Sequence, residues 1–484
     1  MAQALVRNGE PVFRCEEKPP SERIARTKVS MRNTGTEQPV VVRKLRNGSG
    51  AKGLCYPVLE QRSTAREEPM NKTKPYNISK QVVVEAFRRV KANAGAPGVD
   101  QISLEKFEAN LKNNLYTIWN RMSSGSYFPR PVQAVEIPKK SGGIRLLGVP
   151  TVADRVAQMV AKIYFEPCVE PYFHQDSYGY RSGKSAMDAL AVTRQRCWKY
   201  DWVLEFDIKG LFDNINHELL MKAVRKHTDN PWLILYIQRW LEAPIQMPNK
   251  ELVMRTKGTP QGGVISPVLA NLFLHYTFDK WMEKVHPDKP FARYADDAVA
   301  HCHSERAAVQ LKSELEARLS ECGLELHPVK TRIVYCKDGN RRLQHKEIAF
   351  DFLGYTFRPR RAKNREGKYF ISFIPGASNS AKREMRQTIR TWRIQLKSEK
   401  RLEDLSRMFN PILKGWVNYY GRYYKAEMHS VYRRMNRALL EWTMRKYKRF
   451  RQRRKRAWNW LIQIAKREPK LFVQWEKNYL SWAG

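Results

Sequence analysis

Three aspartates in two apolar segments are the residues of this chain best suited to chemistry. Asp296 and Asp297 are adjacent within residues 291–300, Phe-Ala-Arg-Tyr-Ala-Asp-Asp-Ala-Val-Ala, a run that predicts a β-hairpin with the acids at its tip. Asp207 lies near the end of an earlier apolar run, residues 203–208. If the two strand ends meet, the three carboxylates can hold two divalent metals about 3.5–4 Å apart and join nucleotides by in-line phosphoryl displacement.

Alternation along the 203–208 strand places Glu205 and Asp207 on one face and the apolar residues between them on the other. We therefore expect the acidic face to point to a site and the apolar face to pack on helices. Clustered carboxylates repel one another, so their joint ionisation needs a cation. Mg²⁺ suits them as a hard ion. Taken alone, the acid pair at 296–297 is equally compatible with a solvated turn, and Asp207 with a strand-end acid or helix cap.

The charge balance favours a nucleic-acid partner. The chain has 88 Lys and Arg against 48 Asp and Glu, a formal net charge of +40. Each phosphate contact made by such a surface releases a condensed counterion. No long apolar span and no signal-peptide pattern occur, so we expect no membrane. The seven scattered cysteines form no Cys-x-x-Cys pair, which argues against structural zinc and for reduced thiols in a cytosolic compartment.

The chain divides into three regions. Residues 1–75 are polar with weak periodicity and predict a flexible arm. Residues 76–374 mix helices and strands, so the fold class is α+β, and residues 375–484 are helical, aromatic and very basic. Hydrophobic periodicity predicts helices near 78–90, 104–119, 154–165, 217–226 and 307–319, and a helix after Pro267. Strands are predicted at 203–208, 332–336, 348–357 and 369–373, with two more within 133–150.

Two segments resemble a known family. Residues 294–297, Tyr-Ala-Asp-Asp, resemble the YxDD box of reverse transcriptases. Residues 207–215, Asp-Ile-Lys-Gly-Leu-Phe-Asp-Asn-Ile, resemble the palm motif of group II intron reverse transcriptases, or maturases. The resemblance runs from about residue 78 to the C-terminus. It implies a right-hand polymerase with fingers, an antiparallel palm sheet and an all-α basic thumb (X) domain. It also implies two Mg²⁺ at the metal-ligating positions Asp207, Ile208, Asp296 and Asp297.

The same resemblance implies a nucleotide pocket. Phe212 would be the steric gate that crowds a ribose 2′-hydroxyl, and Gln261, in the turn-rich segment 258–267, would line the incoming nucleotide. Lys139 and Arg145, on either side of a Gly-Gly turn, would contact the triphosphate. Lys330 would protonate the pyrophosphate leaving group and so join the catalytic residues. Without that context Phe212 is equally a core residue and the three cations are surface charges.

Two further segments resemble the blocks that contact template and primer. Tyr178 and Arg181, in the basic glycine-containing loop 178–185, would contact the template. Phe352, Leu353 and Gly354 would form the primer grip. The alternative for the second segment is an ordinary buried strand with a bulge glycine.

The basic C-terminal region contains Gly-Trp-Val-Asn-Tyr-Tyr at residues 415–420, which resembles the thumb or X-domain motif of maturases. Aromatic residues at helical spacing are often core, but the arginine density suits structured RNA read by shape and phosphates. We therefore expect RNA-binding residues on this region: Trp416, Tyr419, Tyr420, Arg433, Arg434, Arg445, Lys446 and Arg449.

The resemblance implies an RNA-directed DNA polymerase that also binds its intron RNA and promotes splicing and retrohoming. Its partners would be group II intron RNA, an RNA template with a DNA primer, target DNA and dNTPs, in the bacterial cytoplasm at the nucleoid. No Cys or His follows Trp460, so an endonuclease-lacking form is expected. Two alternatives stay open: an RNA-binding splicing cofactor with an idle polymerase site, and a domesticated reverse transcriptase in DNA repair or phage defence.

Overall fold

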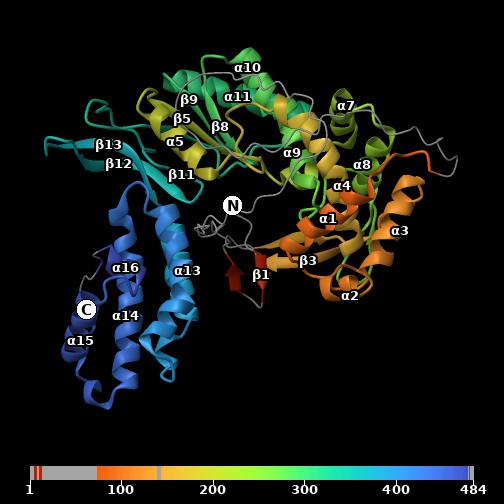
Figure 1. Ribbon diagram of the computed structural model, residues 1–484. Coiled ribbons are helices and arrows are strands. Elements are labelled where there is room, and N and C mark those ends of the chain that lie inside the picture. Colours follow the sequence, from red (N-terminus) through yellow and green to blue (C-terminus); the bar gives the residue numbers. More distant parts are fainter. Residues whose placement is uncertain (1–4, 8–9, 13–73, 139–142, 478, 480–484) are drawn as a thin grey trace, which may run out of the picture. The chain divides into compact units, whose positions relative to one another are not determined.

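A four-stranded antiparallel sheet carries the three aspartates. The computed structural model describes residues 5–7, 10–12, 74–138, 143–477 and 479. The sheet has the order β10-β5-β9-β8 (Figure 1). Its strands are β5 (Trp202–Asp207), β8 (Phe291–Tyr294), β9 (Asp297–Cys302) and β10 (Arg332–Tyr335), and every neighbouring pair is antiparallel. The predicted antiparallel palm sheet and the α+β class are confirmed.

Both faces of this sheet are covered. Leu204 and Phe206 on one face belong to the large hydrophobic core, as the alternation in β5 predicts. Helices that contribute to this core include α4 (Val152–Val169), α7 (His217–His227), α9 (Ser266–Leu274) and α11 (Glu305–Glu321). Val203 and Val299 on the opposite face pack with α5 (Ala186–Cys197) and with a second sheet. Burial on two sides fixes the strands that position the acids.

The second sheet has the order β11-β12-β13, with β11 (Phe350–Phe352), β12 (Tyr355–Lys363) and β13 (Tyr369–Ala377). A single strand was expected at 348–357, but Leu353 and Gly354 have φ of 50° and 78°, so the chain reverses there and β11 pairs with β12. Two successive residues with positive φ form the tight turn of a two-residue hairpin.

The N-terminal part of the fold combines helices with a third sheet, of order β4-β3-β6-β7. Its strands are β3 (Val132–Pro138), β4 (Ile144–Val149), β6 (Ile245–Gln246) and β7 (Leu252–Val253), and its helices include α1 (Lys80–Ala92) and α8 (Pro231–Glu242). The helix expected at 104–119 is two helices, α2 (Leu104–Ala109) and α3 (Leu111–Ser123). Asn110 between them has φ −124° and ψ 43°, and asparagine favours such non-helical cap positions.

Short elements complete this part of the chain. They are η1 (Glu170–Tyr172), α6 (Leu211–Asn214), the π-helix η2 (His275–Asp279) and α10 (Lys280–Val285). Two three-residue strands, β1 (Leu5–Arg7) and β2 (Glu10–Val12), pair antiparallel. Apart from those strands and residues 74–75, the expected arm at 1–75 lies outside the described residues, and so does Lys139.

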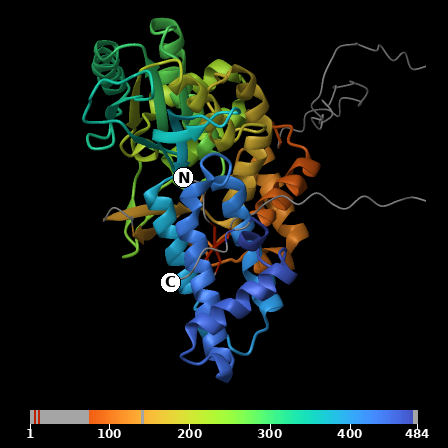
Figure 2. The ribbon, with the colours of Figure 1, turned by 90° about the vertical axis from the view of Figure 1, so that its left-hand side faces the viewer.

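After Ala377 all described elements are helical. They are α12 (Asn379–Thr391), η3 (Ile394–Leu396), α13 (Leu402–Tyr420), η4 (Lys425–Met428), α14 (His429–Lys446), η5 (Lys448–Phe450), α15 (Arg454–Arg467) and α16 (Val473–Glu476). These helices are blue in Figure 1 and Figure 2 and enclose a hydrophobic core of their own. The boundary expected at 374/375 falls inside β13, and the three-domain division stays a prediction. None of the helices that the structure describes is long and apolar enough to cross a membrane.

Candidate active site

The β8–β9 hairpin holds Asp296 and Asp297 at a two-residue turn. Tyr294 pairs with Asp297, and Ala295 and Asp296 connect the strands. Ala295 has φ of 58°, a left-handed conformation that a residue with a Cβ adopts at some cost in energy. The strain persists because the buried strands on either side dictate the turn. The hairpin expected at 291–300 is therefore present, with its acids at the tip.

The pairing of β5 with β9 brings the third acid to this turn. Asp207 lies directly opposite Asp297 in the antiparallel register. Opposed residues project their side chains to the same face, with Cβ atoms about 4.5–5.5 Å apart. The Ile208 N–H donates to the carbonyl oxygen of Asp296 at 3.4 Å, which ties the end of β5 to the turn. Asp207, Ile208, Asp296 and Asp297 thus come together from segments about ninety residues apart in the sequence.

The electrostatics of the acids are those of crowded carboxylates. Burial raises the pKa of Asp296, and the charge of Asp207 raises it further. Burial also raises the pKa of Asp297, where the charges of Asp296 and Asp207 act in the same direction. Each carboxylate therefore makes ionisation of the others harder, and a bound cation would relieve that repulsion.

Lys330 supplies positive charge at this site. Its Nζ donates to Asp207 Oδ2 at 2.5 Å, although the two residues are 123 positions apart. The Lys330 side chain is 53% exposed, while that of Asp207 is only 19% exposed. The lysine thus reaches in from solvent to a half-buried carboxylate, which a simple surface charge would not do. A cation that binds Asp207 Oδ2 would compete with this contact.

The aspartates offer the oxygen ligands that Mg²⁺ prefers, but they do not form a complete ligand set by themselves. Among the described residues, no three His, Cys, Asp or Glu side chains are arranged so that they could hold a metal ion. Mg²⁺ prefers oxygen ligands and is usually held by one or two carboxylates together with substrate phosphates and water. The facing pair Asp207 and Asp297, with Asp296 beside it, offers ligands of that kind.

Glu205 does not serve this site, contrary to the expectation for the acidic face of β5. It is 8% exposed and accepts hydrogen bonds from Arg332 Nη2 at 2.7 Å and from the Asp351 N–H at 3.1 Å. Burial raises its pKa to about 7, against the opposing effect of Arg332. The side chain connects β5 to β10 and to β11, so its role is in the framework behind the aspartates.

Residues from three distant segments converge on the expected nucleotide pocket. Arg145 Nε donates to Gln261 Oε1 at 2.6 Å, and Gln261 Nε2 donates to the two carboxylate oxygens of Asp213 at 3.3 and 3.2 Å. Phe212 is half-buried against the core, and its carbonyl accepts the Thr259 N–H at 2.6 Å. The hydrogen bonds therefore join the side chains of Arg145, Gln261 and Asp213 in one chain, and Phe212 precedes Asp213 in the sequence.

Glycine is required at position 262, where the backbone packs against β4. Gly262 has φ of 133°, and a Cβ built on it would lie 2.3 Å from the carbonyl oxygen of Gly148 in β4. The Gly148 N–H in turn donates to the Gln261 carbonyl at 3.0 Å. Glycine at 262 therefore allows the backbone of residues 261–263 to lie directly on the β3–β4 hairpin.

Two residues of this pocket were not identified from the sequence. Asp213 bonds Gln261, and its position six residues after Asp207 in the palm motif was the available signal. Arg255 precedes the turn-rich segment. Its guanidinium nitrogens are buried without a hydrogen-bond partner among the described residues. Burial lowers the pKa of Arg255 to about 10, and the charge of Asp213 opposes that shift. No sequence signal marked Arg255.

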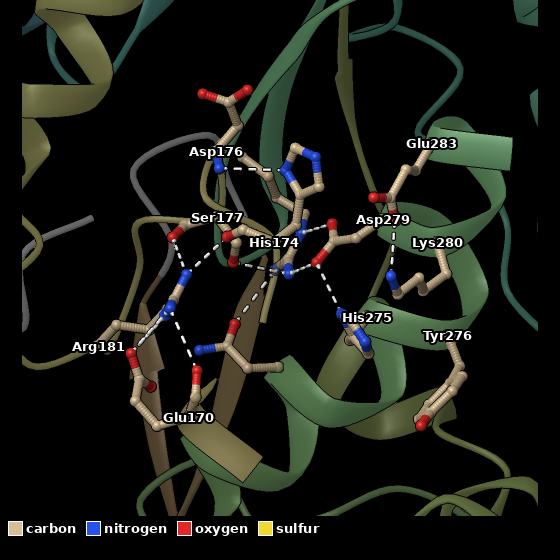
Figure 3. Close-up of polar contacts among 12 residues, drawn as sticks. Glu170, His174, Asp176, Ser177, Arg181, His275, Tyr276, Asp279, Lys280 and Glu283 are labelled. Carbon is tan, nitrogen blue, oxygen red and sulfur yellow. Dashed lines mark hydrogen bonds and ion pairs between the residues drawn. The ribbon is translucent and has the colours of Figure 1, made fainter. Parts of the chain in front are cut away.

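The expected template loop is built around Arg181. Its Nη1 donates to the carbonyls of His174 at 2.6 Å and Ser177 at 2.8 Å, and its Nε donates to Glu170 Oε1 at 2.8 Å (Figure 3). Tyr178 is 4% exposed, and its hydroxyl donates to Asp176. The donors of Arg181 are thus used within the protein, where they fix the loop. A template contact by this loop stays a prediction.

A buried arginine, Arg293, donates a hydrogen bond to the turn that contains Ala295. Arg293 is 1% exposed and forms an ion pair with Asp279 of the π-helix, with Nε to Oδ1 at 2.7 Å (Figure 3). Its Nη2 donates to Ser177 Oγ at 2.8 Å, and its Nη1 donates to Asn271 Oδ1 at 3.1 Å and to the Ala295 carbonyl at 3.3 Å. π-helical turns occur frequently at functional sites. This network joins the template loop, η2 and the aspartate hairpin.

The expected primer grip contacts the helical region. Phe352 is fully buried, and the Leu353 carbonyl accepts the Tyr419 hydroxyl at 2.8 Å. The hydroxyl of Tyr355 donates to the Tyr419 carbonyl. A Cβ on Gly354 would lie 2.9 Å from Tyr420 Oη. The β11–β12 turn is therefore fixed by the two tyrosines at the end of α13.

This packing bears on the residues expected to bind RNA. Trp416 is 6% exposed and stacks on Trp392 with ring centroids 5.7 Å apart, which contradicts an RNA contact through its ring. Tyr419 and Tyr420 point into the contact with the β11–β12 turn. The alternative, aromatic residues at helical spacing as core, therefore holds for Trp416.

The basic residues of α14 and η5 divide into two groups. Arg433, Arg445 and Arg449 are exposed, and so is the continuous segment 451–456. Lys446 instead donates to the Ser398 and Lys400 carbonyls at 2.8 and 2.6 Å. Arg434 is half-buried, and its Nη1 lies 3.8 Å from a carboxylate oxygen of Glu441. The exposed group stays a prediction for RNA binding.

Comparison with known families identifies the class. Residues 137–357 match the family described as reverse transcriptase (RNA-dependent DNA polymerase). The aspartate hairpin, β5 and the residues of the expected nucleotide pocket at 145, 212 and 261 all lie within this match, so this part of the chain is a reverse transcriptase domain. Residues 382–459 match the group II intron, maturase-specific domain. The chain therefore carries a reverse transcriptase domain followed by a group II intron maturase-specific domain.

Curated relatives align with different parts of this chain. Protein YkfC from Escherichia coli (strain K12) is 29% identical over 336 residues, which cover 60% of this chain and 84% of YkfC. Group II intron-encoded protein LtrA from Lactococcus lactis subsp. cremoris is 32% identical over 203 residues, 41% of this chain and 33% of LtrA. A solved telomerase from Candida albicans aligns over 73% of this chain and 66% of its own at 12% identity, with a TM-score of 0.41.

Proposed function

We propose that the chain is an RNA-directed DNA polymerase that extends a DNA primer on an RNA template by a two-metal mechanism. The register that sets Asp207 opposite Asp297, with Asp296 in the adjoining turn, is the observation that carries the proposal. These carboxylates and Ile208 would hold two Mg²⁺, which would activate the primer 3′-hydroxyl and neutralise charge on the triphosphate. Crowded acids without such a purpose would only weaken the fold.

The neighbouring residues have roles that follow from their contacts. Arg145 would contact the triphosphate, and Gln261, held between Arg145 and Asp213, would line the base and sugar of the incoming dNTP. Phe212 would crowd a 2′-hydroxyl and so favour dNTPs. Lys330, whose Nζ already lies at the edge of the acid cluster, would move from Asp207 to the leaving pyrophosphate and protonate it. Lys139 would act with Arg145 on the triphosphate.

A second, non-chemical activity is proposed for the helical region. The maturase-specific match over 382–459 supports binding of group II intron RNA in a form competent for splicing. The exposed residues Arg433, Arg445 and Arg449 provide phosphate contacts of the kind that structured RNA takes. Splicing chemistry would then belong to the RNA, and copying of the intron into target DNA at the bacterial nucleoid would use the polymerase site.

Primer extension tests the polymerase proposal. Asp296→Ala should lower the rate on an RNA template with a DNA primer by about 10³-fold or more, because metal-assisted charge stabilisation supplies several kcal/mol. Asp288→Ala removes the same group from an exposed surface position and should leave the rate unchanged. Equal rates for the two variants would contradict the proposal.

Splicing of the intron RNA separates the two activities. If the Asp296→Ala protein still promotes splicing, the RNA-binding role is independent of the polymerase site. A wild-type protein that promotes splicing but extends no primer would favour the alternative of an idle polymerase site. A gene that stands free of any catalytic-intron sequence would favour a domesticated enzyme of DNA repair or phage defence.

A further inference from the structure

The outer part of the β12–β13 hairpin exposes apolar side chains. β11 pairs only with residues 355–357 of β12, so beyond that point β12 and β13 form a two-stranded ribbon (Figure 1). Near its tip Tyr369 is 55% exposed, Phe370 47% and Ile371 44%. Three consecutive exposed apolar residues on an edge strand are unusual, because such an edge invites association with other molecules.

Cations flank these side chains on one face. In the register Lys363 lies opposite Tyr369 and Arg361 opposite Ile371, so strand alternation projects all four side chains to the same side. The Arg361 guanidinium lies 3.8 Å from the centre of the Tyr369 ring, and Lys363 Nζ lies 5.7 Å from it. The face therefore consists of an exposed aromatic ring between two positive charges.

The cations at the tip have no acidic partner among the residues that the structure describes. Within the part of the chain that the structure describes, the side chains without a carboxylate at ion-pair distance include Arg361, Lys363, Arg365 and Lys368. The single acid of the tip, Glu366, accepts a hydrogen bond from Asn364 Nδ2 at 3.4 Å. Lys368 instead fixes the tip through its backbone, whose N–H donates to Asn364 Oδ1 at 2.8 Å.

The base of the same hairpin shows the contrast. Arg358 and Arg360 both donate to Glu427 Oε1, at 2.9 and 3.2 Å, and Lys382 contacts the other carboxylate oxygen. These partners hold the pKa of Glu427 at about 2, against the effect of burial. The hairpin is thus anchored by paired cations at its base and presents unpaired cations at its tip, as a surface for an external anion would.

From this contrast we infer that the Arg361, Lys363, Tyr369 and Ile371 face binds an unpaired segment of RNA, with a base stacked on Tyr369 and phosphates on the two cations. The inference rests on the proposed RNA-binding function and adds a site outside the polymerase cleft and the helical region. Unstacked bases are accessible to aromatic rings, whereas bases in a duplex are not. The ring is already flanked by the charges that a sugar-phosphate backbone requires.

Binding of a fluorescein-labelled 16-nucleotide oligo(U) RNA to the full chain tests the inference. Tyr369→Ala should weaken binding about 5- to 150-fold, because the variant lacks the ring on which one base stacks. Tyr369→Phe, which keeps the ring, should bind as the parent does. Arg361→Gln with Lys363→Gln should make the salt dependence shallower by a slope of about 1.4, since each single-strand phosphate contact contributes about 0.7.

A matched control is available in α2 and α3. Tyr116 is also 55% exposed, and Tyr116→Ala with Lys106→Gln and Lys112→Gln likewise removes one tyrosine ring and two positive charges. This control should bind oligo(U) within about twofold of the parent. Unchanged affinity and salt slope in the hairpin variants would overturn the inference. So would normal RNA binding together with lost binding to vesicles of anionic phospholipid, which would make the hairpin a membrane-surface site.

Primer extension separates failure of this inference from failure of the proposed function. All hairpin variants should extend a preformed primer–template at the parent rate, because their side chains lie outside the acid cluster and the nucleotide pocket. If the parent protein extends primers and the variants bind RNA normally, only the hairpin site is excluded. If the parent extends no primer, the polymerase proposal fails whatever the hairpin does.

Discussion

At the scale of single residues, the turn that carries the acids depends on a buried ion pair, Arg293 with Asp279. Arg293 is buried beneath the aspartate hairpin and donates to the Ala295 carbonyl, while Asp279 neutralises it. Breaking a buried ion pair by removing one partner leaves an uncompensated charge, whereas replacing both partners removes the problem. The pair therefore combines a structural charge with a hydrogen bond to the turn that carries Asp296.

Arg293→Met should lower the free energy of unfolding by about 3–5 kcal/mol, because Asp279 then lacks its partner. The double variant Arg293→Met with Asp279→Leu should show a smaller decrease in the free energy of unfolding. Urea unfolding of the two proteins measures the difference. Primer extension should be impaired in both, because neither retains the bond to Ala295. Equal stability losses in the single and double variants would contradict the account of the pair.

The burial of Arg293 could not be predicted from the sequence. An arginine before Tyr-Ala-Asp-Asp has no local signal of burial, since its partners Asp279 and Asn271 lie on other elements. The expectation for Glu205 is wrong for a similar reason. Alternation predicts the face of β5 on which Glu205 lies, but only the tertiary structure shows that its carboxylate is bound by Arg332. The resemblance correctly predicted that Asp207 lies beside Asp296 and Asp297. The motifs occur along the chain in the family's order, and the strands that carry them pair with each other.

At the scale of elements, strong alternation and helical periodicity predicted β5, the β8–β9 hairpin and the helices α1, α4, α7 and α11. The failures occur where one or two residues interrupt an otherwise continuous pattern. Asn110 divides the helix expected at 104–119, and Leu353 with Gly354 divides the strand expected at 348–357. Apolar residues continue on both sides of each break, so hydrophobic pattern alone cannot locate it.

The Leu353-Gly354 turn gives a prediction for this scale. Gly354→Ala should destabilise the protein more than Gly323→Ala does. Both glycines have positive φ, but only at 354 does the new Cβ meet an atom, Tyr420 Oη at 2.9 Å. Strain at positive φ alone costs about 1 kcal/mol.

The background Tyr420→Phe removes the clashing oxygen and serves as the control. In that background the urea midpoints of the Gly354→Ala and Gly323→Ala proteins should differ by less than they do in the parent. A difference that stays the same would mean that the turn does not pack against Tyr420 as described.

At the scale of the whole molecule, the excess of 88 basic over 48 acidic residues predicts electrostatic binding of RNA. The charge is exposed in at least two places, the segment 451–456 and the tip of the β12–β13 hairpin. Affinity for an intron RNA should fall at least about 100-fold between roughly 50 and 200 mM salt, because phosphate contacts release counterions. Titration at several salt concentrations measures the slope, and a change below about threefold would contradict a phosphate-dominated interface.

The central claim is that Asp207, Asp296 and Asp297 jointly hold two divalent ions. The most direct measurement is a count of Mn²⁺ bound to the complex of protein, primer–template and a non-hydrolysable dNTP analogue, made by electron paramagnetic resonance. Our account predicts two Mn²⁺ per protein, with loss of tight binding in Asp207→Asn and in Asp296→Asn but not in Glu205→Gln. A complex that binds no Mn²⁺, or binds it unchanged in both aspartate variants, would contradict the account.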